Sequence, residues 1–473
     1  MDRRKLLVQA GAVLAAGALP AQAGPTKSSA AIGQVNPAVL NPSVLNPAVL
    51  KRVCRTRPNI NGMPAADLDA FKTGVANMMA RPASDPTSWS YQAAMHSTYT
   101  TPTMPLWNGC MHGSIHFLSW HRLFLYYFER ILRAASGSSS LMLPYWNWTA
   151  DRAMPAPFLD TSAGNPLYTS HRYASINGGG LLPASAVAIT TPLADIGFNA
   201  FSGDLEGTPH GAVHVSIGGW MHDVPSAAQD PIFWLHHCNI DRLWEAWIGQ
   251  GGGRTNPTDA GWLNTNFTFY DYNGVQRTMK ASKGLDTCQG LGYRYPSRLK
   301  VHLVSPAWIA LLSTLEASRI HAAPNAPAAT MVLGAEASES KLPLPKGSGR
   351  TYLAFEDIRA ENSEGYYEIY LNPPVGKALE FTDPSYAGNL VLFGLTDRER
   401  AVHHAGMGEK MAGMDMAAPR RVFDISRKLE QMRSTAAASE SLRVVLVLRL
   451  PEGENARAQL VRAKIGRVQL IVQ

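Results

Sequence analysis

Three segments in the first two thirds of the chain carry apolar residues in patterns typical of helices. Residues 63–79 place them at helical spacing after an acidic start at Asp67, residues 114–134 are rich in Trp, Leu, Phe and Tyr, and residues 230–248 continue the pattern. The stretches between them, residues 151–207 and 249–292, are rich in Gly, Pro, Asn and Thr. We therefore expect buried helices with long loops packed on them, and such loops usually carry function.

The pattern changes near Ala323, where an Ala- and Pro-rich stretch predicts a linker. Beyond it, strand-like runs predict a second, mostly antiparallel β domain. We expect the first domain at residues 51–325 and the β domain at residues 326–473. The predicted strands lie at residues 351–355, 366–371, 389–393, 442–450 and 464–472.

The first 50 residues have the pattern of a targeting signal followed by a spacer. Paired arginines precede a short apolar run, and a small-x-small cleavage site ends at Ala23, so residues 1–23 are expected to be a twin-arginine export signal. A general secretory signal or a retained anchor is the alternative, but about a dozen apolar residues are too few to span a bilayer. An Asn-Pro repeat predicts an extended linker within residues 24–50. We expect a periplasmic or secreted protein without a membrane span.

Composition and charge exclude several classes of protein. The chain has 473 residues, of which 45% are hydrophobic and 17% charged, and this excludes a mainly disordered chain, a collagen and a coiled coil. The net charge is +7, but the basic residues of the last strands alternate with Val, Leu and Ile. We expect a solvated strand face there and no nucleic-acid partner. Four cysteines do not make a disulfide scaffold, although Cys54 and Cys288 could pair after export.

Histidines cluster in two windows, and the second window has the spacing of a metal site. His210 and His214 are four residues apart, so a helix would present both imidazoles on one face. His236 and His237 follow on the next helix. Neighbouring helical residues point about 100° apart, so we expect only one of them to face the same ion. We assign His237 as the ligand, with His236 and Asp241 in supporting positions.

The first window contributes His96, His112 and His121. His112 and His121 are half a turn out of phase on a helix, so we expect His112 on a loop before the helix that carries His121. His116 is also out of register and is expected to be a buried residue, not a ligand. Two sets of three imidazoles, without a carboxylate at ligand spacing, favour copper or zinc over Ca²⁺, Mg²⁺ or Mn²⁺.

The order of these motifs resembles the type 3 copper proteins, which are the tyrosinases, catechol oxidases and haemocyanins. The carrying motifs are Cys110-x-His112, His210-x3-His214 and DPIFWLHHCNIDRLW at residues 230–244, together with SWSYQAAMH, LPYWNW and LDTCQGLGYRYPS. They are similar to the tyrosinase and polyphenol oxidase branch over about residues 51–297. The resemblance implies a mainly α catalytic domain, in which a four-helix bundle holds a dicopper site, plus a C-terminal antiparallel β domain. That β domain could shield the site or be permanent structure.

The same resemblance implies two copper ions per chain and O₂ as co-substrate. One ion would be held by His96, His112 and His121, and the other by His210, His214 and His237. A thioether between Cys110 and His112 is implied, with an ordinary buried thiol as the alternative. The implied reaction converts o-diphenols to o-quinones, with ortho-hydroxylation of monophenols as a second activity on small phenolic substrates. A haemocyanin-like oxygen carrier is the alternative function, and a dinuclear zinc or iron hydrolase is a more distant one.

Four further positions match family residues around the substrate. Glu206 matches a glutamate that holds a water near the second copper, and a base there is useful because phenols have a pKa near 10. Gly211 stands where monophenol-hydroxylating members often carry Asn, which favours diphenol oxidation. Val215 and Val224 match residues that shape the entrance, and two small apolar residues suggest an open aromatic pocket. Core packing is the alternative for both valines.

A His- and Met-containing segment lies outside the catalytic pattern. Thioethers and imidazoles together suit Cu(I), so the segment could deliver or store copper. A surface insertion of the β domain is the alternative. Its residues are His403, His404, Met407, Met411, Met414 and Met416.

Overall fold

The computed structural model describes residues 54–296 and, with short gaps, residues 328–472. The described intervals of the second part are residues 328–333, 337–344, 349–362, 364–407, 420–435, 441–454 and 462–472. Residues 52–473 belong to one compact unit. The expected export signal and the Asn-Pro linker lie outside the described residues.

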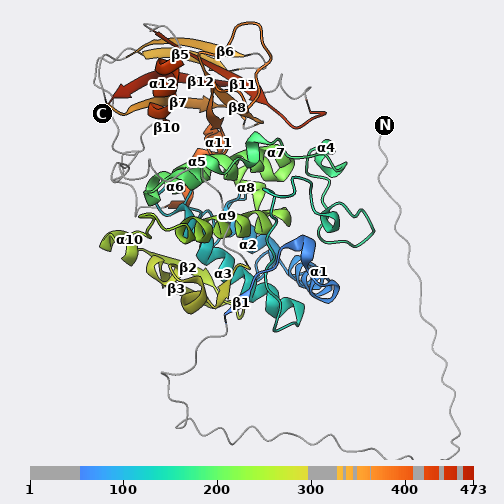
Figure 1. Ribbon diagram of the computed structural model, residues 1–473. Helices are drawn as coiled ribbons and strands as arrows, with labels where there is room; N and C mark the ends of the chain where they lie inside the picture. The colour runs from blue at the N-terminus through green and yellow to red at the C-terminus, as the bar shows by residue number, and fades with distance from the viewer. Residues whose placement is uncertain are drawn as a thin grey trace, which may run out of the picture. The chain divides into compact units, whose positions relative to one another are not determined.

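Four helical segments bring the histidine motifs together in the first part of the chain (Figure 1). They are α2 (Trp89–His96), α3 (Phe117–Ser136), α7 (Ala212–Ile217) and α9 (Ile232–Gly249). The helix α1 (Ala65–Met79) packs on α3. The helices predicted at residues 63–79, 114–134 and 230–248 are therefore confirmed as α1, α3 and α9, within a few residues at each end.

The central helices are held by aromatic packing. Most of α3 is buried, and its Phe128 ring stacks on Trp234 of α9 with ring centroids 3.3 Å apart. Trp89 of α2 meets the edge of the same Trp234 ring. The helix α3 ends at Gly137, whose φ of +71° suits glycine because it has no Cβ to clash. This packing fixes the spacing of the helices that carry the histidines.

The two stretches expected to be loops contain more regular structure than their composition suggests. The antiparallel hairpin of β2 (Asn266–Tyr270) and β3 (Gln276–Lys280) lies in the second stretch, and α6 (Phe198–Leu205) lies in the first. Further short helices in these stretches are α4 (Ala174–Asn177), α5 (Thr190–Ala194) and α10 (Ala260–Asn264), and α8 (Val224–Ala227) lies between the two stretches. The expectation of loops is wrong there because packing against the core stabilises short elements that local propensity does not predict.

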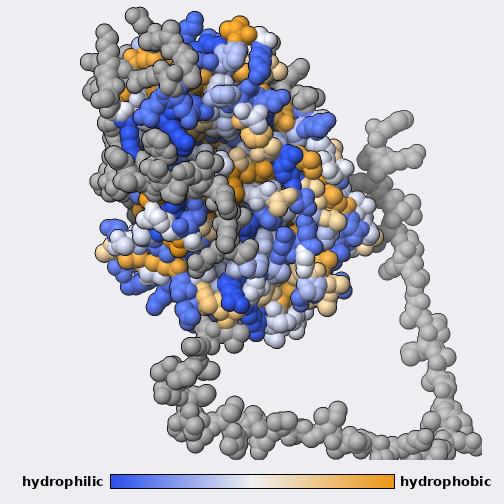
Figure 2. All heavy atoms as spheres, viewed as in Figure 1, coloured by the Kyte–Doolittle hydropathy of each residue, from blue (hydrophilic) through white to orange (hydrophobic). Residues whose placement is uncertain are grey.

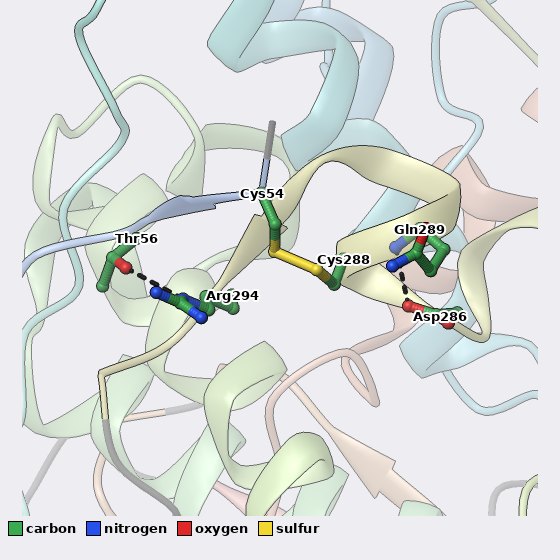
Figure 3. Close-up of a disulfide and its surroundings, with 6 residues drawn as sticks. All are labelled: Cys54, Thr56, Asp286, Cys288, Gln289 and Arg294. Carbon is green, nitrogen blue, oxygen red and sulfur yellow. Dashed lines mark hydrogen bonds between the residues drawn. A yellow bond between two sulfur atoms is a disulfide. The ribbon is translucent and has the colours of Figure 1, made fainter. Parts of the chain in front are cut away.

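A disulfide ties the start of the described chain to the segment after the β2–β3 hairpin (Figure 3). Cys54 and Cys288 are bonded, and their Cα atoms are 5.1 Å apart. Next to the bond, β1 (Arg55–Thr56) pairs in parallel with β4 (Tyr293–Arg294). The pairing that the sequence left open is therefore present in the structure.

The C-terminal part contains two four-stranded antiparallel sheets. One sheet has the order β10 (Arg421–Asp424), β7 (Thr351–Ala360), β12 (Ala463–Val472) and β5 (Ala328–Leu333). The other has the order β6 (Ser338–Pro343), β11 (Ser441–Arg449), β8 (Tyr366–Leu371) and β9 (Tyr386–Val391). The five predicted strands are confirmed, whereas β5, β6, β10 and the helices α11 (Asp397–Met407) and α12 (Ser426–Thr435) were not predicted.

The last strand agrees with a solvated strand face, because Lys464 and Arg467 are exposed between buried apolar residues. In the strand before it, Arg443 pairs with Glu339 at 3.0 Å, and Arg449 pairs with buried Glu368 at 2.6 Å. Hydrophilic and hydrophobic residues are interspersed on the face drawn in Figure 2. Among the described residues, no helix combines the length and the apolar character needed to cross a bilayer.

Candidate metal centre

Six histidines from five places in the chain converge on one buried site. His96 ends α2, His112 lies on the loop before α3, and His121 lies in α3, where the centroids of the three rings are 4.9 to 5.5 Å apart. His210, His214 and His237 form a second triangle, with centroids 4.7 to 5.5 Å apart. The two triangles meet where His121 stacks on His237 at 4.5 Å. The expected loop position of His112 is observed.

The local backbone explains why His210 and His214 point the same way. The segment Glu206–Gly211 is kinked at Thr208, whose φ of −136° and ψ of 122° are not helical, and after the kink the chain runs into α7. The side chains of His210 and His214 are fully buried. Their i, i+4 spacing places both imidazoles at the centre.

Backbone carbonyls set the tautomer of four of the imidazoles. The Nδ1 atoms lie 2.8 to 3.2 Å from backbone oxygens, which can only accept, so each Nδ1 carries the proton. Each Nε2 then keeps its lone pair, the arrangement usual for metal-binding histidines. The pairs are His96 with Val224, His121 with Phe117, His210 with Glu206, and His214 with Met221.

The ring nitrogens have the proximity and the chemistry that a metal ion requires. His214 Nε2 and His237 Nε2 are 3.3 Å apart, and two nitrogen ligands of a four-coordinate ion also lie about 3.3 Å apart. The buried Nε2 atoms of His121 and His210 have no hydrogen-bond partner among the described residues. Burial lowers the pKa of His121 to about 3 and that of His210 well below its usual range, so both imidazoles are neutral at pH 7 and can act as ligands. The donor set therefore fits a borderline metal such as copper.

His236 differs from its neighbour His237 in its hydrogen bonding. The ring nitrogens of His210, His214, His236 and His237 lie within 4.8 Å of one another, so the expectation that the helical offset keeps one of the pair away is wrong. The indole N–H of Trp148 donates to His236 Nδ1 at 3.2 Å, and an indole can only donate. The proton of His236 is therefore on Nε2, and neutral His236 has no free lone pair for a metal. Because of this hydrogen bond, His236 differs from His237 in its ability to bind a metal ion.

Cys110 lies beside His112, as the thioether idea requires. One ring nitrogen of His112 and the Sγ atom of Cys110 lie within 4.8 Å of each other and of a ring nitrogen of His96. Cys110 is buried, and burial raises the pKa of its thiol to about 12. Neither ring nitrogen of His112 has a hydrogen-bond partner among the described residues.

Glu206 contributes both its backbone and its side chain to the site. Its backbone oxygen accepts from His210, and its Oε1 accepts from the N–H of Gly113 at 2.6 Å. Burial raises the pKa of Glu206 to about 7, while the guanidinium of Arg421 and the Gly113 hydrogen bond oppose the rise. Arg421 belongs to β10, so the β domain contributes to the electrostatics of this carboxylate.

Asp241 acts on the position of a helix and does not reach an imidazole. Its carboxylate accepts from Arg122 at 2.5 Å and from the hydroxyls of Tyr293 and Tyr295 at 2.6 Å. It also pairs with buried Arg57 at 3.3 Å. This cluster joins α9 to α3 and to the segment stapled by the disulfide, and it supports the centre by fixing where α9 lies.

A segment of the β domain covers the histidines. The ring of Phe393 stacks on His214, and its centroid lies 5.6 Å from that of His210 and 5.8 Å from that of His112. Phe393 follows β9. The strand predicted at residues 389–393 did not indicate that Phe393 would contact the histidines. We call residues 391–394 the covering segment.

The two valines that suggested an open pocket are buried. Val215 is fully buried and Val224 is 6% exposed. The Val224 N–H donates to Glu399 of α11 at 3.0 Å, so the β domain closes over this residue. The expectation of an open entrance is therefore wrong for the arrangement in this structure.

Two other sequence features lie apart from the centre. His116 stacks on Trp262 with centroids 5.3 Å apart, and its Nδ1 lies 3.2 Å from Ser119 Oγ, which agrees with its expected role outside the ligand sets. The side chains of the proposed copper-delivery segment lie outside the described residues. They are His403, His404, Met407, Met411, Met414 and Met416.

Sequence comparisons place the two parts of the chain in known families. The common central domain of tyrosinase matches residues 86–198 and 184–250, and the polyphenol oxidase middle domain matches residues 256–308. A domain of unknown function matches residues 309–473. The chain is 28% identical to tyrosinase HcTyr1 from Hahella sp. (strain CCB-MM4), over 88% of this chain and 99% of that protein.

Plant relatives match over a shorter region. The chloroplastic polyphenol oxidase of Malus domestica is 31% identical over 51% of this chain, and the match spans about half (48%) of that protein. Two solved structures share the fold over 89% of this chain: a latent aurone synthase, with a TM-score of 0.63 and 21% identity over 90% of its own chain, and latent apple tyrosinase, with 0.61 and 23% over 97%. The domain matches and the two histidine triangles lead to one conclusion: this chain is an oxidoreductase of the tyrosinase and polyphenol oxidase family of type 3 copper proteins.

Proposed function

We propose that this protein is an exported, O₂-dependent dicopper oxidase that converts small o-diphenols to o-quinones. The observation that carries the proposal is the pair of buried imidazole triangles, in which backbone hydrogen bonds leave the Nε2 atoms of His121, His210 and His214 for metal. The relatives named tyrosinase and polyphenol oxidase support phenols as the substrate class. The signal pattern of residues 1–23 supports a periplasmic or secreted location.

The two triangles supply the ligands. His96, His112 and His121 hold one copper ion, and His210, His214 and His237 hold the other. When bound, the two adjacent ions supply the joint uptake of O₂ and the two-electron oxidation of the phenol. Supporting contacts keep the imidazoles in place: His236 is fixed by Trp148, and a thioether from Cys110 restrains His112.

Glu206 is the base of the proposed reaction. A phenol has a pKa near 10 and must lose its proton as it is oxidised. With its pKa raised to about 7, Glu206 can accept a proton at neutral pH, directly or through a held water. The Gly113 N–H fixes the direction of the carboxylate.

The neighbourhood of His210 favours diphenols over monophenols. Gly211 offers no side-chain amide to orient a monophenol, whereas an o-diphenol brings two hydroxyl groups of its own. Phe393 stacks on His214, so an aromatic substrate that stacks on this face of the imidazole would have to displace Phe393. We therefore propose that the β domain at residues 326–473 is a shield and that the intact chain is a latent form.

The test compares two substrates on copper-loaded mature protein, intact and after proteolytic opening. Copper per chain is measured first, followed by O₂ uptake and quinone absorbance with a monophenol and with its o-diphenol. We expect two copper ions and rapid turnover of the diphenol only. Equal turnover of both phenols would make the enzyme a tyrosinase despite Gly211. Copper without turnover, even after opening, would favour an oxygen carrier, and absence of copper would overturn the proposal.

A further inference from the structure

Gly211 lies where the β domain meets the metal centre. A Cβ atom added at this residue would lie 3.0 Å from Val391 Cγ1, 3.3 Å from the backbone oxygen of Glu206 and 3.5 Å from Phe393 Cβ. Two of these three neighbours belong to the covering segment. Steric repulsion makes distances of 3.0 to 3.4 Å rare for native Cβ atoms, so the contacts with Val391 and Glu206 are tight, whereas the distance to Phe393 is that of an ordinary contact.

The backbone of Gly211 gives no other reason for a glycine. Its φ of −64° and ψ of −35° are ordinary helical values that any L-residue adopts. Glycine is also less favourable than alanine next to a helix interior, since it loses more conformational freedom on folding. Lack of space for a side chain is the remaining physical reason.

The opposing surface is rigid. Val391 is 3% exposed and pairs with Tyr366 in the register of β9 and β8, so its backbone is held by the sheet. Phe393 is 6% exposed and is held against His214. Gly394 continues the segment to Val224, where an added Cβ would lie 3.7 Å from the valine side chain. The covering segment thus lies between Gly211 and Val224 and cannot retreat from a larger side chain without losing these contacts.

We propose that Gly211 is the docking position of the covering segment, so that the side chain at position 211 sets how tightly the β domain closes over the site. An alanine loosens the closed arrangement, and an asparagine is incompatible with it because it adds three more heavy atoms in the same space. Position 211, whose side chain would affect the preference between monophenols and diphenols, is therefore sterically constrained in this chain by the β domain. The effect on turnover rests on the proposed function, whereas the docking contact is steric and needs no metal.

The chain offers a matched control four residues earlier. Gly207 lies before the kink at Thr208, and a Cβ added there has no atom of the described residues within 4 Å. Gly207→Ala therefore makes the same chemical change nearby in the chain without contacting the described β domain. Val391→Ala removes the methyl group that a Cβ at position 211 would meet, so it is expected to rescue the variant at that position.

The experiment measures hydrogen exchange of residues 386–393 in the copper-free full chain. The variants are Gly211→Ala, Gly207→Ala, Val391→Ala and the double variant Gly211→Ala/Val391→Ala, which complete a double-mutant cycle. We expect Gly211→Ala to speed exchange of this segment about tenfold, which corresponds to about 1.4 kcal/mol. Gly207→Ala should match the parent, and the double variant should exchange more slowly than the sum of the single effects predicts.

Unchanged exchange in Gly211→Ala, or an equal effect of Gly207→Ala, would overturn the inference. If Gly211→Ala does not fold, recovery of a folded chain by the added Val391→Ala supports the contact, and lack of any recovery contradicts it. Copper-loaded Gly211→Ala is further expected to oxidise an o-diphenol faster than the parent without proteolysis. If Gly211→Ala exchanges faster but none of the variants oxidises a phenol, even after proteolytic opening, the docking position is supported. The proposed function is then refuted.

Discussion

The ring of Phe393 stacks on the imidazole of His214, with ring centroids 4.2 Å apart and planes 18° from parallel. One residue follows a strand of the β domain, and the other is a proposed copper ligand on α7. An aromatic substrate that stacks on the same imidazole must first displace this ring. The contact therefore links turnover of phenols to the position of the β domain.

Phe393→Ala should activate the intact chain. A stacked aromatic pair contributes about 0.5–1.5 kcal/mol beyond its buried area, so kcat/KM for an o-diphenol should rise roughly 2- to 10-fold. Phe381→Ala is the matched control, since that ring is 37% exposed in the same domain. A variant with normal copper content and parental kcat/KM would show that the ring does not limit access.

His237→Ala and His236→Ala should differ in copper content. His237 has its Nε2 beside that of His214, whereas His236 is committed to Trp148 through Nδ1. We expect His237→Ala to bind about one copper ion per chain and His236→Ala to keep both, as measured by metal analysis after dialysis. The reverse result would exchange the roles of the two histidines.

Closure of the β domain should weaken as the pH rises. Glu399 of α11 is buried against Asp223, and burial together with that like charge raises its pKa to about 7. The docked state binds the Glu399 proton more tightly than the open state does. The resulting stabilisation of the docked state is therefore fully present below about pH 4.5 and is lost as the pH rises through about 7. Hydrogen exchange of residues 386–393 at pH 5 and pH 8 measures the effect.

Other groups around Glu399 and Asp223 determine how strongly the closure of the β domain depends on pH. Asp223 accepts from the Tyr99 hydroxyl, and the charges of Arg398 and His222 oppose the rise of the Asp223 pKa. Asp223→Asn should reduce the pH dependence without abolishing it, because it removes the like charge while the larger effect of burial on the Glu399 pKa remains. Asp397→Asn, at an exposed carboxylate of the same helix, should leave it intact. Identical pH profiles of the parent and Asp223→Asn would contradict the assignment.

Loss of the Cys54–Cys288 disulfide should destabilise the catalytic part. The bond joins residues far apart in the chain, and such a crosslink typically contributes about 2–4 kcal/mol. Denaturant unfolding of Cys54→Ser should show a loss of this size. The double variant Cys54→Ser/Cys288→Ser should be no less stable than the single one, and an additional loss of similar size would mean that the two cysteines act independently.

Local patterns predicted the elements with strong apolar patterns well and the others poorly. The helices α1, α3 and α9 and the strands β7, β8, β9, β11 and β12 were foreseen because periodicity and β-branched runs extend over many residues. The α6 helix and the β2–β3 hairpin were missed because their surroundings are rich in Gly, Pro, Asn and Thr, and packing on the core stabilises them. The strands β5, β6 and β10 and the helices α11 and α12 were also missed, although β5 and β6 are as long as the predicted β8 and β9.

The spacing of the histidines carried most of the information about the site. Four residues on a helix return to the same face, so His210 and His214 could be paired from the sequence alone. The helical offset between His236 and His237 did not separate them, since all four ring nitrogens of that group lie within 4.8 Å. Trp148 makes the distinction through a hydrogen bond across the chain.

The sequence alone determined the two histidine windows, the helices that carry them, the β-rich C-terminal part and the family resemblance. All of these depend on contacts within a few turns of helix or on the order of motifs along the chain. The tertiary structure decided that Phe393, Val391, Arg421 and Glu399 of the β domain meet His214, Gly211, Glu206 and Val224 of the catalytic part. Such contacts join residues far apart in the chain, and packing of the two parts against each other creates them. Local propensity does not predict that packing. The contacts that cover the metal centre could therefore be identified only in the folded chain.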